Sequence, residues 1–223
     1  MASFFNTSVG RKLVMSLSGL FLVIFVGLHL SINITMLFSA EAYNRAAHFM
    51  ATNPIIKIME PILALGFIFH IIYAFILEIR NISSRGGLSR YSMTKRSHSS
   101  TWSSRNMIWL GLFVLAFLVV HIINFFWKIK FGNVEMITYG NETMHNTYNL
   151  VTSLFKTSVV YDTIYVIGAI ALGFHLHHAF WSAFQTLGWS NQIWRKRLTV
   201  LGDIYAVIIA VGFAIIPLYF LIS

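Results

Sequence analysis

Histidine is the residue type in this sequence that could do chemistry inside apolar segments. Four successive apolar stretches each contain at least one: His29, His70, His121, and a group formed by His175, His177 and His178. An imidazole in the middle of an apolar helix is costly to bury and needs a partner. Because imidazole is the commonest metal ligand among side chains, we expect these residues to hold a metal-containing cofactor.

The stretches that carry the histidines have the length and composition of membrane spans. Crossing a bilayer takes about 20 apolar residues of helix. Five segments meet this requirement: residues 12–38, 56–79, 107–127, 159–184 and 204–222. Of the 223 residues, 57% are hydrophobic and 10% are charged, a balance that excludes a soluble domain. We therefore predict an all-α integral membrane bundle, with residues 1–223 in a single domain. The chain has no cysteine, which excludes disulfides and iron–sulfur ligation within it.

The basic residues, which give a net charge of +9, predict the orientation of this bundle. One side of the membrane would hold eleven of the sixteen: Arg11, Lys12, Arg80, Arg85, Arg90, Lys95, Arg96, Arg105, Arg195, Lys196 and Arg197. The positive-inside rule then places the N-terminus in the cytoplasm and the C-terminus outside. Because these residues lie in loops between spans, we expect them to set the topology and not to bind nucleic acid. The first span is too long for a cleaved signal peptide, and the absence of a targeting peptide fits a bacterial cytoplasmic membrane.

Depth along the spans sorts the histidines into two pairs. A helix rises about 1.5 Å per residue, so His29 and His121 each lie about 6 Å beyond the midpoints of two spans that run outward. His70 and His175 lie past the midpoints of two spans that run inward. Depth therefore predicts an outer pair, His29 with His121, and an inner pair, His70 with His175. Two imidazoles at one height on different helices are what an axially coordinated haem requires, so we predict two b-type haems. An iron with two imidazole ligands has no open position, so these centres would transfer electrons and not bind oxygen.

The fourth span leaves a choice of ligand. His175 and His178 share a helix face, whereas His177 points about 200° round from His175. His175 stands between Ala171 and Ala179, in a groove of small side chains that would admit a flat macrocycle. His175 is therefore the preferred ligand, and His178 is either the alternative ligand or a group beside it.

Other cofactors and functions fit the histidines less well. No Cys and no intramembrane Asp or Glu accompanies them, so a zinc or di-iron site lacks ligands. No carboxylate is expected in mid-helix, which also leaves a buried acidic proton relay without a carrier. From a different class, the chain could be a haem-free proton-coupled transporter with histidines along its path. That interpretation predicts an internal repeat, which the sequence does not show clearly.

Four motifs resemble a known family. The N-terminal region has TSVGRK (7–12) and MSLSGL (15–20) ahead of His29, the third span opens with WSSRNM (102–107), and the fourth contains HLHHAFWSAFQTLG (175–188). Together they resemble the di-haem cytochrome b membrane anchor of succinate dehydrogenases and fumarate reductases, in its five-helix single-chain form. The likeness covers nearly the whole chain. Ala179 departs from the glycine that many relatives carry at this position.

The resemblance implies the same pairing of the histidines and a place in a respiratory complex. A flavoprotein subunit would oxidise succinate, a step of the tricarboxylic acid cycle, and an iron–sulfur subunit would dock on the basic cytoplasmic loops. Electrons would pass through the inner and outer haems to menaquinone or another quinone near the outer face, and the complex could form a higher oligomer. The same role in a quinol:fumarate reductase is the alternative. The haem subunit of a hydrogenase or formate dehydrogenase is a weaker one, because QTLG (185–188) argues against it.

Two sets of polar residues are candidates for contacts with these cofactors. Propionates of the inner haem need cationic or hydroxyl partners at the cytoplasmic ends of the spans, for which the candidates are Ser16, Ser18, Arg105 and Gln185. The resemblance favours Ser16. Quinone chemistry needs a proton donor or acceptor beside the carbonyls. The outer-side candidates for it are Glu41, His48 and Glu60.

Overall fold

Five long helices form most of this computed structural model, which describes residues 7–84, 106–189 and 191–223. They are α1 (Ser8–Asn33, extended by the 3-10 turn η2, Ile34–Leu37), α3 (Pro54–Ser84), α5 (Met107–His121), α8 (Val159–Thr186) and α9 (Gln192–Ile222). α5 continues through a π-helical turn, η3 (Ile122–Phe126), into α6 (Trp127–Phe131). Each of the five is long and apolar enough to cross a membrane. The predicted helical class and the five predicted spans are confirmed, and the chain is a multi-pass membrane protein.

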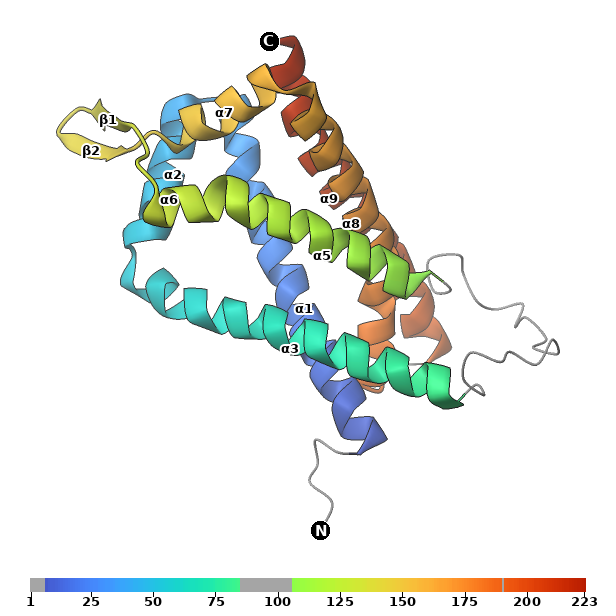
Figure 1. Cartoon of the computed structure of the whole chain (residues 1–223). Helices are drawn as coiled ribbons and strands as arrows, with labels where there is room; N and C mark the ends of the chain where they lie inside the picture. Colours follow the sequence, from blue (N-terminus) through green and yellow to red (C-terminus); the bar gives the residue numbers. More distant parts are fainter. Residues whose placement is uncertain (1–6, 85–105, 190) are drawn as a thin grey trace.

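One end of the bundle carries short elements that the sequence did not predict. They are α2 (Ala40–Thr52), a hairpin of strands β1 (Met136–Tyr139) and β2 (Glu142–His145), and α7 (Thr147–Thr157). The two strands are antiparallel, with Met136 opposite His145. Figure 1 shows these elements at the end of the molecule where the C-terminus lies, with the N-terminus at the opposite end. We call these the capped end and the N-terminal end.

The buried side chain of Asn44 fastens the short elements to one another. Its amide nitrogen donates hydrogen bonds to the Tyr139 hydroxyl (3.1 Å) and to Asn146 Oδ1 (3.3 Å). Its oxygen accepts from the Tyr148 backbone N–H (2.8 Å) and from the Thr147 hydroxyl (3.2 Å). Asn44 is fully buried, so each of these bonds also satisfies a group that water does not reach. α2, the hairpin and the start of α7 therefore form one unit.

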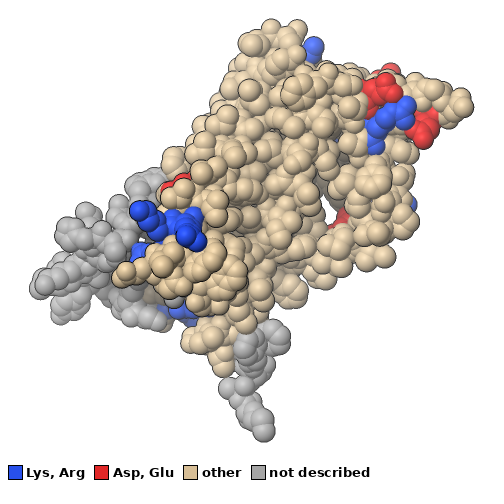
Figure 2. Space-filling model, turned by 180° about the vertical axis from the view of Figure 1, so that it is seen from behind, with Lys and Arg blue, Asp and Glu red and all other residues tan. Residues whose placement is uncertain are grey.

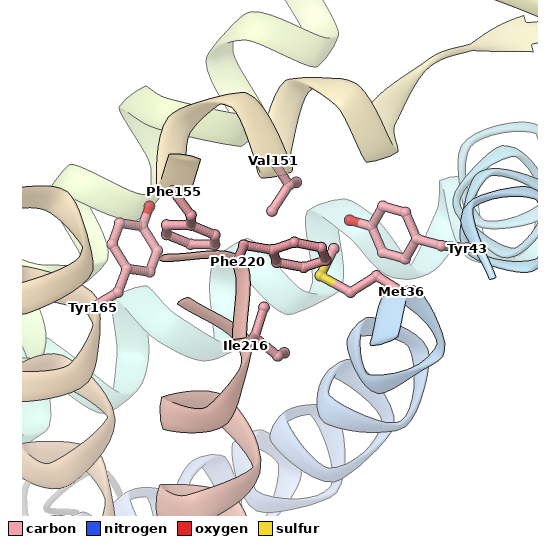
Figure 3. Close-up of a cluster of buried hydrophobic side chains, with 7 residues drawn as sticks. All are labelled: Met36, Tyr43, Val151, Phe155, Tyr165, Ile216 and Phe220. Atoms are coloured by element: carbon pink, nitrogen blue, oxygen red, sulfur yellow. The ribbon is translucent and has the colours of Figure 1, made fainter. Parts of the chain in front are cut away.

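A cluster of apolar side chains joins this unit to the long helices. Figure 3 shows its buried members pointing toward one another: Met36, Tyr43, Val151, Phe155, Tyr165, Ile216 and Phe220. They come from η2, α2, α7, α8 and α9. Between the two ends, the surface is mainly uncharged. On the face that Figure 2 shows, most Lys, Arg, Asp and Glu side chains lie toward the ends and leave a wide belt of other residues, as a bilayer requires.

Glycines bring some of the long helices into close contact. A Cβ on Gly173 of α8 would lie 2.7 Å from the Cβ of Ala210 on α9, and a Cβ on Gly168 would lie 2.4 Å from the Phe117 ring on α5. α1 packs along α3 and also contacts α8 and α9. Among the described residues, α1 does not pack along α5, and α3 does not pack along α8. These two separated helix pairs are the ones that carry the four histidines.

The fifth span begins earlier than predicted. α9 starts at Gln192 and not near residue 204, because the Asn191 side chain caps it by accepting a hydrogen bond from Trp194 N–H (2.9 Å). Asp203 consequently lies inside the helix. The expectation that no carboxylate lies in mid-helix is therefore wrong.

Candidate functional site

The structure brings four histidines of the apolar spans together in two pairs. The ring centroids of His29 on α1 and His121 on α5 are 5.7 Å apart. Those of His70 on α3 and His175 on α8 are 6.3 Å apart. We call the first the upper pair, because it lies nearer the capped end, and the second the lower pair. Depth along the spans gave the same two combinations.

Aromatic and amide side chains surround the upper pair. The Phe25 ring stacks on His29 with centroids 5.4 Å apart, and Phe125 contacts His121 at 5.4 Å. The amide nitrogen of Asn33 donates to the His29 carbonyl (2.8 Å) and lies 3.4 Å from His29 Nδ1. A polar group beside a ring nitrogen fixes the orientation of an imidazole ligand. The upper pair is therefore shielded by rings and oriented by Asn33.

Glycines lie against the lower pair. A Cβ on Gly19 of α1 would lie 3.4 Å from His70 Cε1, and a Cβ on Gly111 of α5 would lie 3.7 Å from His175 Cε1. The Nδ1 atoms of both histidines are buried without a hydrogen-bond partner in the described part of the chain. A buried polar atom without a partner is costly. A neighbouring helix thus packs against each ring of the lower pair, and the Nδ1 atom of each ring is left without a hydrogen-bond acceptor or donor among the described residues.

The spacing within each pair fits an iron held between two imidazoles. A bond from a metal to an imidazole nitrogen is about 2 Å long and the ring centroid lies about 1 Å further, so two axial imidazoles have centroids about 6 Å apart. The ring planes make angles of 88° in the upper pair and 67° in the lower pair. An imidazole ligand could turn about a bond to a metal, so neither angle would prevent the two rings of a pair from holding an iron between them. The residues present fit two bis-imidazole haems.

The residue spacing on three helices gives the separation of the two pairs along the bundle. On each of these helices, ten residues separate a position at one level from a position at the other. The positions are Gly19 and His29 on α1, Gly111 and His121 on α5, and Tyr165, which contacts His121, and His175 on α8. Ten helical residues rise about 15 Å. The two levels are therefore about 15 Å apart along the bundle.

The remaining histidines of α8 have different surroundings. His177 Nδ1 lies 2.7 Å from Asp203 Oδ1 of α9, and both side chains are about two-fifths exposed, 40% and 43%. His178 is half-buried. His175 is the member of this group whose ring contacts His70. This geometry favours His175 over His178 as the partner of His70 and gives His177 a partner on α9.

The described residues that were predicted to contact haem propionates differ in their burial and partners. Ser16 is buried in α1, whereas the Ser18 hydroxyl donates to the Val14 carbonyl (2.8 Å) of its own helix. Gln185 is exposed near the end of α8. Arg105 lies outside the described residues. Ser16 is thus the buried member of this set among the described residues.

The residues predicted to serve a quinone lie at the capped end, where both glutamates pair with basic side chains. Glu41 accepts from Arg45 (2.8 Å), and this hydrogen bond raises the pKa of the Arg45 guanidinium. Glu60 pairs with Lys130 (2.9 Å), and His48 is half-buried in α2. In the described part of the chain, none of the three predicted residues contacts His29 or His121. The structure does not bring them to the upper pair.

Other polar residues, which the sequence analysis passed over, lie closer to the upper pair. Asn124, in the π-helical turn that follows His121, donates to the Tyr165 hydroxyl (3.3 Å), and the Tyr165 ring contacts His121 at 6.1 Å. Asp162, one turn before Tyr165, is 2% exposed, and neither carboxyl oxygen has a hydrogen-bond partner among the described residues. These residues could have been singled out from the sequence, because each is a polar residue inside an apolar span. A π-helical turn is itself frequent at functional sites.

Comparisons with known proteins found no matching protein-family model, no matching curated protein and no matching solved structure.

Proposed function

We propose that this chain is a membrane-embedded electron-transfer subunit that holds two b-type haems, one at each histidine pair. One observation carries the proposal. Two pairs of imidazoles, each pair from helices that do not pack along each other, meet at the separation that an intervening iron requires. Each haem would supply one-electron exchange between its ferric and ferrous states.

At these two levels, side chains of this chain would bind the haem irons, orient the ligand imidazoles and exclude water. His29 and His121 are the ligands at the upper level, where Asn33 orients His29 and the phenylalanine rings exclude water. His70 and His175 are the ligands at the lower level. There Gly19 and Gly111 let the neighbouring helices approach the imidazoles closely. A larger residue at either glycine would press on a ligand ring.

The charges of the chain indicate its orientation in the membrane, and its resemblance to succinate dehydrogenase anchors suggests a route for the electrons. The N-terminal end would face the cytoplasm of a bacterial cell, because Lys12, Arg80 and residues 195–197 lie there. The lower pair would then receive electrons from an iron–sulfur subunit bound to a succinate-oxidising flavoprotein subunit. The upper pair would pass them to menaquinone or another quinone near the capped end.

The proposal is tested by counting haems. The full chain is purified in detergent after haem-replete expression, and its dithionite-reduced minus oxidised spectrum is recorded with a pyridine haemochrome assay. We expect two low-spin b haems per chain. His29→Ala should retain only the lower haem, and His70→Ala should retain only the upper haem. His145→Ala, which changes an exposed histidine of the hairpin, is the control that retains both haems.

A colourless protein would contradict the proposal and would favour a haem-free transporter. A single haem that either substitution removes would also contradict it, because both pairs are expected to bind independently. His178→Ala separates the two candidate ligands of α8. We expect this variant to keep both haems and His175→Ala to lose the lower one.

A further inference from the structure

Aromatic and basic side chains gather where α8 ends and α9 begins, at the N-terminal end of the bundle. Gly188, whose φ of +90° suits glycine, follows the end of α8, and α9 starts at Gln192. Three tryptophans and three basic residues lie in this stretch: Trp181, Trp189, Trp194, Arg195, Lys196 and Arg197. We refer to these six residues as the α8–α9 cluster.

The guanidinium groups of the cluster are held over tryptophan rings. Arg195 Cζ lies 4.9 Å from the centroid of the Trp181 ring, and Arg197 Cζ lies 5.6 Å from that of Trp194. The rings of Trp194 and Trp189 contact each other at 5.8 Å. Stacking of this kind orders the guanidinium plane and leaves the N–H groups at its edge available to an acceptor. The donors are therefore arranged before a ligand binds.

No carboxylate neutralises these charges within the described part of the chain. Carboxylates do pair with basic side chains at the capped end, where Arg45 meets Glu41 and Glu142, and Lys130 meets Glu60. The three basic residues of the cluster are all exposed. Three exposed cations within one helical turn, without an acidic neighbour, create a positive potential that attracts an anion.

The tryptophans indicate which kind of anion the cluster suits. Trp189 and Trp194 are 53% and 43% exposed, so a broad aromatic surface lies beside the charges. Tryptophan is enriched at the level of lipid headgroups, where its apolar ring contacts the lipid and its N–H donates a hydrogen bond to polar groups. A free phosphate compound would use the charges and leave the rings uncovered. A phospholipid would use both, with its phosphate on the basic side chains and its glycerol and upper acyl chains on the rings.

We propose that the α8–α9 cluster is a binding site for an anionic phospholipid of the phosphatidylglycerol class. The site is separate from both histidine pairs and does not depend on the proposed electron transfer. It differs from general attraction of basic loops to anionic membranes, because the arginines are fixed on rings at one place. A lysine in place of Arg195 would keep the charge and lose the planar stacking, so Arg195→Lys should weaken binding.

Quenching of tryptophan fluorescence by brominated lipids measures binding at this place. With Trp102, Trp109 and Trp127 replaced by phenylalanine, only the tryptophans of the cluster fluoresce. The full chain is reconstituted in phosphatidylcholine containing a minor fraction of brominated phosphatidylglycerol, or the same fraction of brominated phosphatidylcholine. We expect phosphatidylglycerol to be preferred by about fivefold for each basic residue that contacts it.

Two triple variants distinguish this site from a general surface charge. Arg195→Gln/Lys196→Gln/Arg197→Gln should abolish the preference. Lys57→Gln/Lys128→Gln/Lys156→Gln removes the same charge at the capped end and should retain it. Native mass spectrometry of the chain with all its tryptophans gives a second measurement, in which added phosphatidylglycerol should stay bound to the unsubstituted chain and be lost from the first triple variant.

Four results would overturn the proposal. Equal quenching by the two lipids shows that the cluster has no selectivity, and equal loss in both triple variants shows that the overall charge explains it. Displacement of the lipid by soluble glycerol phosphate shows that the cluster binds soluble phosphate compounds. Loss of the preference when the chain is in its native complex shows that a protein subunit covers the cluster, so that a lipid is not its occupant.

Discussion

Replacement of Gly168 by alanine tests how the upper pair is held in place. A Cβ at this position of α8 would lie 2.4–2.7 Å from three atoms of the Phe117 ring, and ordinary contacts begin at 3.4 Å, so the ring must move by up to about 1 Å. The ring has little freedom to do so, because it contacts Tyr165 at 5.1 Å and His121 at 5.9 Å. We therefore expect the displacement to reach His121, which lies one helical turn beyond Phe117 on α5.

The size of the effect follows from two opposing contributions to the free energy of unfolding. Overpacking costs about 1–3 kcal/mol, and alanine in place of a helical glycine returns about 0.5–1 kcal/mol. The two contributions give a net loss between about 0 and 2.5 kcal/mol, and the short contacts with the Phe117 ring favour the upper part, about 1–2 kcal/mol. This loss corresponds to a fall in Tm of roughly 2–8 °C for a chain of this length. If the upper pair binds a haem, the spectrum of that haem should change while the spectrum of the other haem does not.

Thermal unfolding and the reduced minus oxidised spectrum of the purified chain measure these two effects separately. Adding Phe117→Leu to Gly168→Ala should restore part of both, because the smaller side chain makes room for the new methyl group. Gly202→Ala is the matched control. Its Cβ would meet Phe180 at 3.0 Å, away from both histidine pairs, so any change in Tm should come without a spectral change. A Gly168→Ala chain that melts at the original temperature would refute the packing argument. A lower Tm with an unchanged upper haem would refute the coupling to His121.

Three further substitutions test other parts of the molecule. Asn44→Ala should lower the free energy of unfolding by about 2–4 kcal/mol in thermal or denaturant unfolding, because four hydrogen bonds of about 1 kcal/mol each are lost. Asn44→Asp still accepts from Tyr148 N–H but buries a carboxylate against the Asn146 oxygen, so it should lose at least as much, and a clearly smaller loss would contradict this account. Asp162→Asn should leave the Tm unchanged or raise it, because a neutral amide is cheaper to bury than an unpartnered carboxylate; a lower Tm would mean that the carboxyl has a polar partner. Gly19→Leu should remove the same haem as His70→Ala in the haemochrome assay, and loss of both haems or of neither would argue against the close approach of Gly19 to His70.

The five spans could be predicted because the thickness of the hydrocarbon layer fixes how many apolar residues a helix needs. The start of α9 could not be predicted in the same way. Its first turns contain Arg195, Lys196 and Arg197, which hydropathy does not count as part of a span, although Asn191 caps the helix ahead of them. The helix therefore extends beyond its apolar run and takes in Asp203.

The short elements of the capped end were missed for a different reason. Neither α2 nor α7 is long enough to be stable alone, so each depends on tertiary contacts. Asn44 supplies these contacts by bonding to residues about a hundred positions away in the sequence, such as Asn146 and Tyr148. No local pattern around Asn44 distinguishes it from an ordinary surface asparagine. Its role is visible only when the hairpin and α7 are packed against α2.

The histidine sites could be predicted from the sequence in part, because some of their features are local and others depend on neighbouring helices. Each histidine could be singled out alone, because an imidazole in an apolar span is costly. The glycines could not, since Gly19 and Gly111 matter only through the rings of His70 and His175 on neighbouring helices. Yet the spacing of ten residues from glycine to histidine is the same on α1 and α5, and α8 repeats it between Tyr165 and His175. Two planar groups held one above the other would impose one interval on every helix that passes both of them. The shared spacing is therefore a stronger argument for two stacked sites than any one histidine, and the sequence already contained it.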